Sequence, residues 1–110
     1  MPTKTYPGEF EQVVLLAILQ CRDQAFALEV RRKIEDSTGR SVSRGAFYTP
    51  LDRLERKGLL EWSMETPEDA RAAAELRLYR VTEPGVEALR SSRAALMTLW
   101  RGLDVLKERA

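Results

Sequence analysis

The chain has 110 residues, of which 44% are hydrophobic and 32% are charged, and this size and composition indicate one globular domain rather than a disordered chain. Its formal net charge is only +1, so the bulk charge gives no support for binding to nucleic acid. The sequence contains a single cysteine and no histidine, which excludes an internal disulfide, a histidine-ligated zinc ion and catalysis of the Ser-His or Cys-His type.

The N-terminal segment predicts an arm followed by a buried helix. Residues 1–8 contain two prolines and one glycine and should form a flexible arm. They lack the pattern of a targeting signal, and no apolar run in the chain approaches the roughly 18–20 residues of a membrane span, so we expect a cytoplasmic protein with no membrane partner. Residues 9–21 predict a helix that is apolar nearly all round, which indicates burial within the chain or by a partner chain. We assign Leu15 of this helix to a dimer interface, and we expect Cys21 to be a small buried hydrophobe.

The next segment predicts a helix-turn-helix. A second helix is expected over residues 25–38 and ends at Gly39. After a turn of few residues, a third helix (residues 43–58) opens at Ser43, a favourable N-cap, and closes at Gly58, a favourable residue just beyond a C-cap. Two helices joined by such a short turn are typical of a helix-turn-helix, whose second helix contacts DNA.

The third helix has two unlike sides. Phe47, Leu51 and Leu54 form one apolar stripe. The other side combines hydroxyl and guanidinium groups, which suits contact with a polyanion that presents base edges; the alternative is a core helix with an ordinary charged outer face. Pro50 either kinks a continuous helix, which the unbroken apolar stripe favours, or marks the first turn of a shorter helix that begins near Thr49. The residues of the polar side are Arg44, Tyr48, Thr49, Asp52, Arg53 and Arg56.

Charge is distributed unevenly around this helix. Residues 40–60 contain five basic and two acidic side chains, whereas residues 61–75 contain five acidic side chains and one basic one. Positive charge is therefore concentrated on the third helix, and the segment that follows it is acidic.

The remaining residues predict a hairpin and a long helix. Residues 59–64 and 76–82 should form two strands of a β-hairpin, and a hairpin placed after a helix-turn-helix is a wing. Residues 83–107 should form a helix that begins with Thr82 as its cap, and Gly102 costs this helix about 1 kcal/mol. The expected fold class is mainly α with a small antiparallel β-hairpin, a winged helix-turn-helix followed by a long C-terminal dimerisation helix.

The leucines of the last helix repeat at heptad spacing, which exceeds what a compact winged domain needs for its own core and predicts self-association. The alternative is that this helix packs back on the first helix of the same chain. We therefore expect three parts: a flexible arm (residues 1–8), a winged helix-turn-helix domain (9–82) and a dimerisation helix (83–110). Besides Leu15, the predicted interface residues are Leu89, Leu96, Leu99, Trp100, Leu103 and Leu106.

Four sequence blocks carry a family resemblance. They read LLAILQ (residues 15–20), VRRKIED (30–36), TGRSVSRGAFYTPLDRLERKGLL (38–60) and LYRVTEPGVEAL (78–89). With these blocks the chain resembles the PadR family of bacterial transcriptional regulators, in the short form that has a single C-terminal dimerisation helix. The resemblance covers nearly the whole chain after residue 8.

Two segments depart from the family pattern. Many members carry a Gly-Tyr pair before the second helix, where this chain has Ala25 and Phe26; we expect Phe26 and Leu28 to fill the core in its place. Members also commonly have a glycine- and arginine-rich wing tip, whereas this tip is acidic, rich in alanine and lacks glycine. An acidic tip repels phosphate, so either only Arg71 and Arg77 reach DNA from the wing, or the wing has another task.

The resemblance implies a homodimeric repressor that binds double-stranded operator DNA on the nucleoid, without a cofactor and without enzymatic activity. The third helix would enter the major groove, and one of Arg53 and Arg56 would contact phosphate while the other pairs with Asp52 or Glu55. Trp100 is expected either to be interface core or to line a cavity for a small aromatic ligand. The alternative function is a winged-helix protein-interaction module with little or no DNA binding. The predicted DNA contacts are Ser43, Arg44, Tyr48, Thr49, Arg53, Arg56, Arg71 and Arg77.

Overall fold

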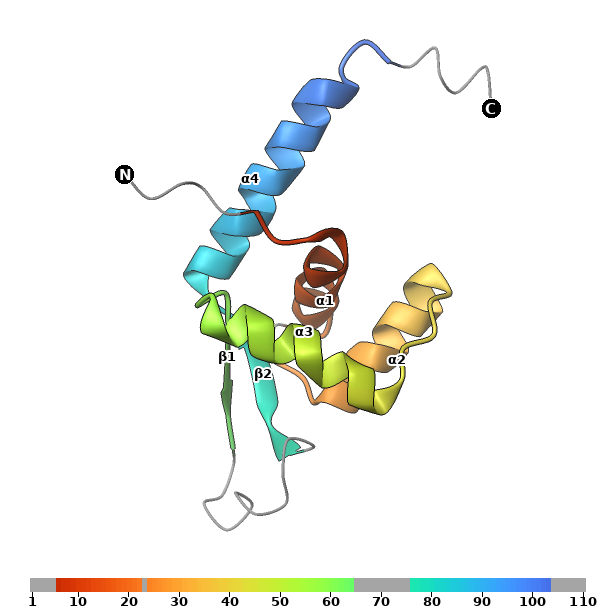
Figure 1. The fold of residues 1–110 in the computed structure, drawn as a ribbon, viewed down its shortest axis with the longest axis vertical. Coiled ribbons are helices and arrows are strands. Elements are labelled where there is room, and N and C mark those ends of the chain that lie inside the picture. Colours follow the sequence, from red (N-terminus) through yellow and green to blue (C-terminus); the bar gives the residue numbers. More distant parts are fainter. Residues whose placement is uncertain (1–5, 23, 65–75, 104–110) are drawn as a thin grey trace.

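The computed structural model describes residues 6–22, 24–64 and 76–103. Three helices, a two-stranded antiparallel hairpin and a long final helix follow one another in the chain (Figure 1). This order confirms the predicted mainly α class with a hairpin. The elements are α1 (Glu9–Gln20), α2 (Ala27–Thr38), α3 (Arg44–Arg56), β1 (Leu60–Ser63), β2 (Leu78–Val81) and α4 (Glu83–Trp100).

Helix α1 forms the centre of the core. It packs against α2, α3, β2 and α4, and Val14, Leu15 and Ile18 have no exposed surface. The prediction that Leu15 lies in a dimer interface was therefore wrong, because its side chain is already buried by its own chain. Pro7 is buried and its carbonyl accepts a hydrogen bond of 3.0 Å from the Gln12 side chain, so the folded domain begins before Glu9 and includes the end of the predicted arm.

Helix α2 begins two residues later than predicted. Ala25 exchanges two backbone hydrogen bonds with Tyr79, of 3.1 and 2.9 Å, so the chain before α2 pairs with the sheet instead of continuing the helix. Phe26 then serves as N-cap, and its N–H donates to the Glu29 carboxylate at 3.0 Å. Phe26 is half-buried, but Leu28 is 47% exposed; the expectation that Leu28 fills the core was wrong.

Helix α3 is continuous through Pro50, as the unbroken apolar stripe predicted. Ser43 caps it, because its hydroxyl accepts from the Ala46 N–H at 3.2 Å. Phe47, Leu51 and the ring of Pro50 are buried against the core. The helix ends at Arg56, and Gly58 follows its Lys57 cap in the left-handed conformation, with φ of 76°.

The predicted hairpin is confirmed, with strands shorter than expected. Leu60 pairs with Val81 and Trp62 pairs with Tyr79, which places these four side chains on the face that packs toward the core. The predicted acidic wing tip and Arg71 lie outside the described residues.

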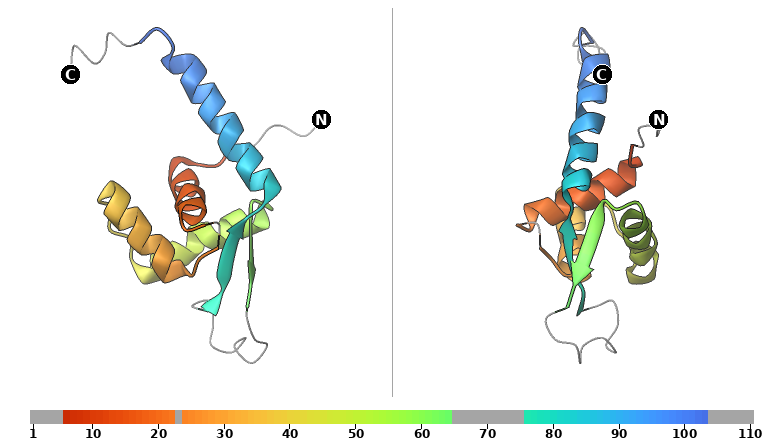
Figure 2. Two further views of the ribbon diagram at one scale, coloured as in Figure 1. Left: turned by 180° about the vertical axis from the view of Figure 1, so that it is seen from behind. Right: turned by 90° about the vertical axis from the view of Figure 1, so that its left-hand side faces the viewer.

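Helix α4 starts in close contact with the end of α3. The Thr82 hydroxyl accepts from the Gly85 N–H at 3.1 Å and donates to the Gly58 carbonyl at 2.7 Å. A Cβ at Gly85 would lie 2.3 Å from the Leu59 carbonyl oxygen, so only glycine allows this approach. From here α4 projects away from the rest of the domain (Figure 2).

The predicted helix over residues 83–107 was too long. It ends at Trp100, and Gly102 follows with φ of 81°, a conformation that interrupts an α-helix and that glycine adopts readily. Leu103 therefore lies beyond the helix, and Leu106 lies outside the described residues. None of the described helices has the length and apolar character that a membrane span requires.

Replacing Gly85 by alanine should lower the free energy of unfolding by about 1–3 kcal/mol, because the new methyl group meets backbone that cannot move aside. Gly45 is the matched control, since it also lies in a helix but a Cβ at this position would meet no heavy atom within 4 Å apart from its chain neighbours and the backbone of its own helix. Gly45→Ala should leave stability unchanged or raise it by roughly 0.5–1 kcal/mol. Urea unfolding followed by circular dichroism measures both, and equal effects of the two substitutions would contradict the close contact.

Candidate nucleic-acid interface

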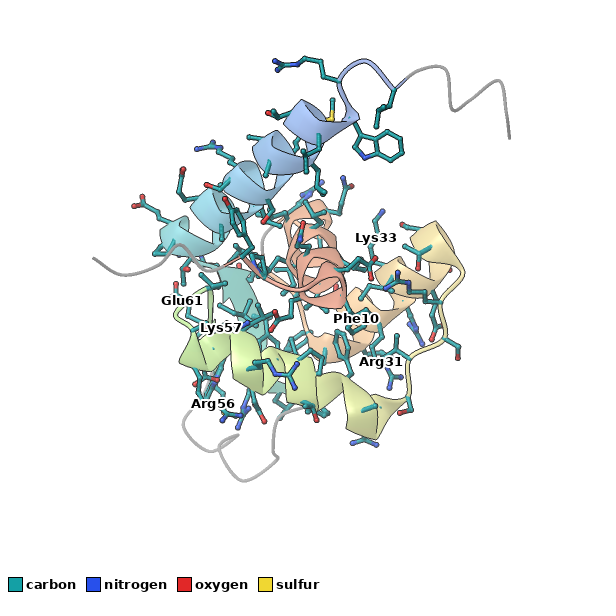
Figure 3. The ribbon with its side chains drawn as sticks, turned by 45° about the horizontal axis from the view of Figure 1, so that its top comes forward. Phe10, Arg31, Lys33, Arg56, Lys57 and Glu61 are labelled. Atoms are coloured by element: carbon teal, nitrogen blue, oxygen red, sulfur yellow. The ribbon has the colours of Figure 1, made fainter. Side chains whose placement is uncertain are left out.

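The outward side of α3 carries basic and hydroxyl side chains. Arg44, Thr49, Arg53 and Arg56 are exposed, and Figure 3 shows Arg56 on the side of α3 turned away from α1 and α4. Neither Arg53 nor Arg56 forms an ion pair with any acidic side chain in the described part of the chain. Tyr48 is half-buried and packs against the core, so only part of it faces outward. This surface brings together the sequence-predicted residues of α3.

The two carboxylates of α3 are engaged by the hairpin. Trp62 on β1 donates its indole N–H to the Glu55 carboxylate at 2.7 Å. The Arg77 guanidinium lies 3.9 Å from the Asp52 carboxylate and 4.3 Å from the centre of the Trp62 ring. The predicted pairing of Arg53 or Arg56 with these acids was therefore wrong, because both carboxylates contact hairpin residues that lie farther away in the sequence.

Arg77 is not placed as a wing residue that reaches outward. Its side chain is 26% exposed and is stacked on Trp62, so the prediction that it contacts DNA from the wing does not match its position. The packing of Trp62 and Arg77 on α3 was missed from sequence, because the contact joins residues of the hairpin to a helix and leaves no local spacing signal.

Beneath this contact lies Tyr79, the largest fully buried side chain. Burial raises the pKa of the Tyr79 hydroxyl; Arg77 opposes this rise, and the nearby Tyr48 and Asp52 add to it. The hydroxyl therefore stays neutral at physiological pH. Residues of α3 and of the hairpin thus meet in one cluster beside α3.

A partly buried ion pair fixes the C-terminal end of α3 to α1. The Lys57 ammonium lies 2.9 and 3.1 Å from the two Glu11 oxygens, and the Gly8 N–H donates to the same carboxylate at 2.7 Å. Burial by itself would raise the pKa of Glu11, but the Gly8 N–H, Lys57 and Arg53 outweigh it and lower the pKa below its ordinary value of 4.5. Sequence reasoning missed this pair, because 46 positions separate the two residues.

A second contact holds the turn before α3. Arg40 donates to the Glu9 carboxylate at 2.6 Å and lies 5.7 Å from the centre of the Phe10 ring. Both partners belong to α1, so α1 is linked to each end of the segment that carries α3.

An apolar groove of about 470 Å³ lies between α1 and α4. Its lining includes Leu16 and Leu96, which are 51% and 52% exposed, and Trp100, which is 57% exposed. Leu89 is 8% exposed and belongs to the core of the chain, so it has little surface left for a partner. Leu99 and Leu103 are exposed but do not line the groove.

The described residues contain no cluster of carboxylate and cysteine side chains that could hold a metal ion.

The fold and the surface define a winged helix-turn-helix: two helices joined by a short turn, the second with a basic outward side, followed by a two-stranded hairpin. The profile of the transcriptional regulator PadR-like family matches residues 15–91. The chain belongs to this family of transcriptional regulators, which is not a family of enzymes, and the resemblance seen in the sequence is confirmed.

Several solved structures have the same fold as this chain. F93 from STIV, described as a winged-helix DNA-binding protein, superposes with a TM-score of 0.68 at 14% identity, over 89% of this chain and 98% of its own. RosR of H. salinarum gives a TM-score of 0.68 at 22% identity, over 93% and 84%. A PadR-like transcription factor from Bacteroides fragilis gives 0.66 at 21% identity, over 94% and 92%. No curated protein matches the sequence.

The Glu11–Lys57 pair predicts a loss of stability in acid. Because the folded chain holds the pKa of Glu11 below 4.5, the unfolded chain takes up this proton first as the pH falls, and the free energy of unfolding decreases. Glu11→Gln removes this titration, so the stability difference between wild type and Glu11→Gln should be largest at neutral pH and shrink below pH 4.5. Urea unfolding over a pH series measures it.

Lys57→Met provides the matched test from the other side of the pair. It leaves a buried carboxylate without its cation, so it should destabilise the chain more at neutral pH than in acid, where Glu11 is protonated. A cost that does not change with pH for either variant would show that the pair has no such role.

Proposed function

We propose that the chain is a sequence-specific DNA-binding repressor that acts as a homodimer on operator DNA. The observation that carries this proposal is the outward side of α3, where Thr49, Arg53 and Arg56 are exposed and neither arginine forms an ion pair with a described acidic side chain. A surface of this kind suits the major groove, where guanidinium groups bind phosphates and guanine edges.

The residues along α3 divide into two roles under this proposal. Arg44, at the first turn of α3, would meet a phosphate near the positive end of the helix dipole, next to the Ser43 cap. Thr49 and the exposed part of Tyr48 would face backbone or base edges. Arg53 and Arg56, farther along the helix, would bind the phosphate backbone.

The partner proposed for the groove between α1 and α4 is a second copy of the chain. Exposed apolar side chains gather on one element, since Leu96, Met97, Leu99 and Trp100 are each more than half exposed on α4. Contiguous apolar surface of this kind marks an interface, and a twofold dimer would present two α3 helices to two half-sites. Trp100 lines the same groove. We infer that a small aromatic effector would bind there, in a cavity between the two copies, and that its binding would cause the dimer to release the DNA.

The second candidate is a winged-helix protein-interaction module. The near-neutral net charge of +1 and the acidic residues 61–75 favour it, whereas the basic side of α3 opposes it. Binding to DNA that weakens steeply with added salt supports the repressor, and an absence of DNA binding at low salt supports the interaction module.

Arg53→Ala together with Arg56→Ala should weaken binding to a duplex from the chain's own promoter. The slope of log K against log salt should become less steep by about 0.9 for each phosphate contact that is lost. Fluorescence anisotropy at several salt concentrations measures this slope. Arg101→Ala is the control, because it removes a positive charge at the far end of α4, and it should leave the slope unchanged; an unchanged slope in the α3 variant would contradict the assignment.

Leu96→Asp should convert the dimer into a monomer, because a carboxylate on the rim of the groove cannot be buried by a partner at low cost. Leu28→Asp is the matched control, since Leu28 is exposed to a similar extent, 47% against 52% for Leu96, but lies on α2. Sedimentation velocity distinguishes the two species. If both variants have the mass of the wild-type protein and that mass is a monomer's, the proposed dimer does not form.

A further inference from the structure

The proposed DNA-binding helix carries charges of both signs. Helix α3 has three arginines but also two carboxylates, Asp52 and Glu55. Asp52 follows Thr49 by three positions and precedes Arg56 by four, so it shares a helix side with both. The side chain of Asp52 is 52% exposed. An uncompensated carboxylate at this place would repel the DNA phosphates that the neighbouring arginines attract.

The hairpin supplies a partner to each of the two carboxylates. The Trp62 indole N–H donates to Glu55 at 2.7 Å, and the Arg77 guanidinium lies 3.9 Å from Asp52. These two hairpin residues also hold each other, because Arg77 lies over the Trp62 ring at 4.3 Å from its centre. A cation over an indole face is attracted by the ring quadrupole, and this stacking restricts where the guanidinium can lie.

Arg77 is poorly placed for a phosphate contact of its own. Its side chain is 26% exposed, half the exposure of the Asp52 side chain that it faces, and its Nε atom is buried without a hydrogen-bond partner in the described structure. A guanidinium that binds DNA must present several N–H groups outward. The packing on Trp62 instead directs the charge of Arg77 toward α3.

We propose that Arg77 and Trp62 mask the two acidic side chains of α3 from DNA. In this role the two hairpin residues hold the acidic side chains of the proposed DNA-binding helix and do not contact phosphate themselves. Both are positioning residues in this role. Arg77 compensates the charge of Asp52, and the Trp62 indole holds the Glu55 carboxylate against the hairpin. The side of α3 that remains effective toward DNA is then defined by its arginines. This inference rests on the proposed DNA-binding function.

A double-mutant cycle distinguishes masking from direct contact. If Arg77 masks Asp52, Arg77→Met leaves the carboxylate uncompensated and weakens DNA binding by roughly tenfold, whereas Asp52→Asn leaves the Arg77 cation uncompensated and should strengthen binding. In the double variant Asp52→Asn should restore the affinity to within about threefold of the wild type. If Arg77 bound phosphate directly, the double variant would stay weaker than the wild type, because Asp52→Asn cannot replace the lost contact.

The salt dependence of DNA binding gives a second measurement. A purely structural role of Arg77 would not change it. Loss of a phosphate contact flattens the slope of log K against log salt by about 0.9, so direct contact predicts a flatter slope in the double variant. Masking predicts that the double variant keeps the wild-type slope. Thermal unfolding of each variant, followed by circular dichroism, verifies that all of them are folded under the binding conditions.

Trp62→Phe tests the other half of the mask. Phenylalanine keeps an aromatic face under Arg77 but has no N–H for Glu55, so binding should weaken, and Glu55→Gln should restore it in that background. Glu55→Gln in the wild-type background should have little effect. Equal effects of Glu55→Gln in both backgrounds would overturn this half of the proposal.

The probe for all variants is a labelled random-sequence DNA duplex at low salt, because repulsion by a carboxylate acts on any phosphate backbone. A wild-type chain that fails to bind this duplex refutes the proposed DNA-binding function itself. A wild-type chain that binds, with a double variant that stays as weak as Arg77→Met and has a flatter salt slope, refutes only the masking role. Binding by the wild type, with restored affinity and an unchanged salt slope in the double variant, is the expected result.

Discussion

The burial of α1 is the constraint on which the other elements depend. A helix that is apolar on most sides must be covered on most sides, and here α2, α3, β2 and α4 all pack against it. Covering it in this way places α3 at the surface with its apolar stripe inward, and therefore with its basic side outward. It also fixes where α4 can begin, since Gly85 must approach the backbone of Leu59 before α4 can leave the domain.

Polar contacts then set the orientation of α3, which burial alone does not determine. Apolar packing is roughly proportional to area and has little directional preference, whereas hydrogen bonds and ion pairs act at defined atoms. Arg40 and Lys57 join the two ends of the α3 segment to Glu9 and Glu11 of α1. The contacts of Asp52 and Glu55 with the hairpin hold the middle. The helix that we propose to read DNA is thus held at several points by side chains that do not face the DNA.

Local signals in the sequence were sufficient for the elements but not for these contacts. Caps and terminators such as Ser43, Gly58 and Thr82 act within a few residues, so the helices, the continuous α3 and the hairpin could be predicted. The length of α4 was overestimated, because the leucine spacing continues past Gly102 although the backbone turns there. The partners of Asp52, Glu55 and Glu11 could not be predicted, because each lies on another element and pairing depends on the tertiary arrangement. Leu15 was misassigned for the same reason: an all-round apolar helix does not reveal whether its own chain or a partner covers it.

The distribution of these pairs also explains how a chain with a net charge of +1 can present a basic surface. At physiological ionic strength a charge acts over about 8 Å, so a phosphate responds to the side chains near it and not to the sum over the molecule. Near the ends of α3, Arg40 and Lys57 form ion pairs with Glu9 and Glu11 of α1. The two acids on α3 itself contact the hairpin, while Arg53 and Arg56 form no ion pair with a described acid. Net charge is therefore a poor guide to function in a small domain whose acidic side chains around α3 are paired internally. The arrangement of the pairs, and not their number, decides the field that a ligand meets.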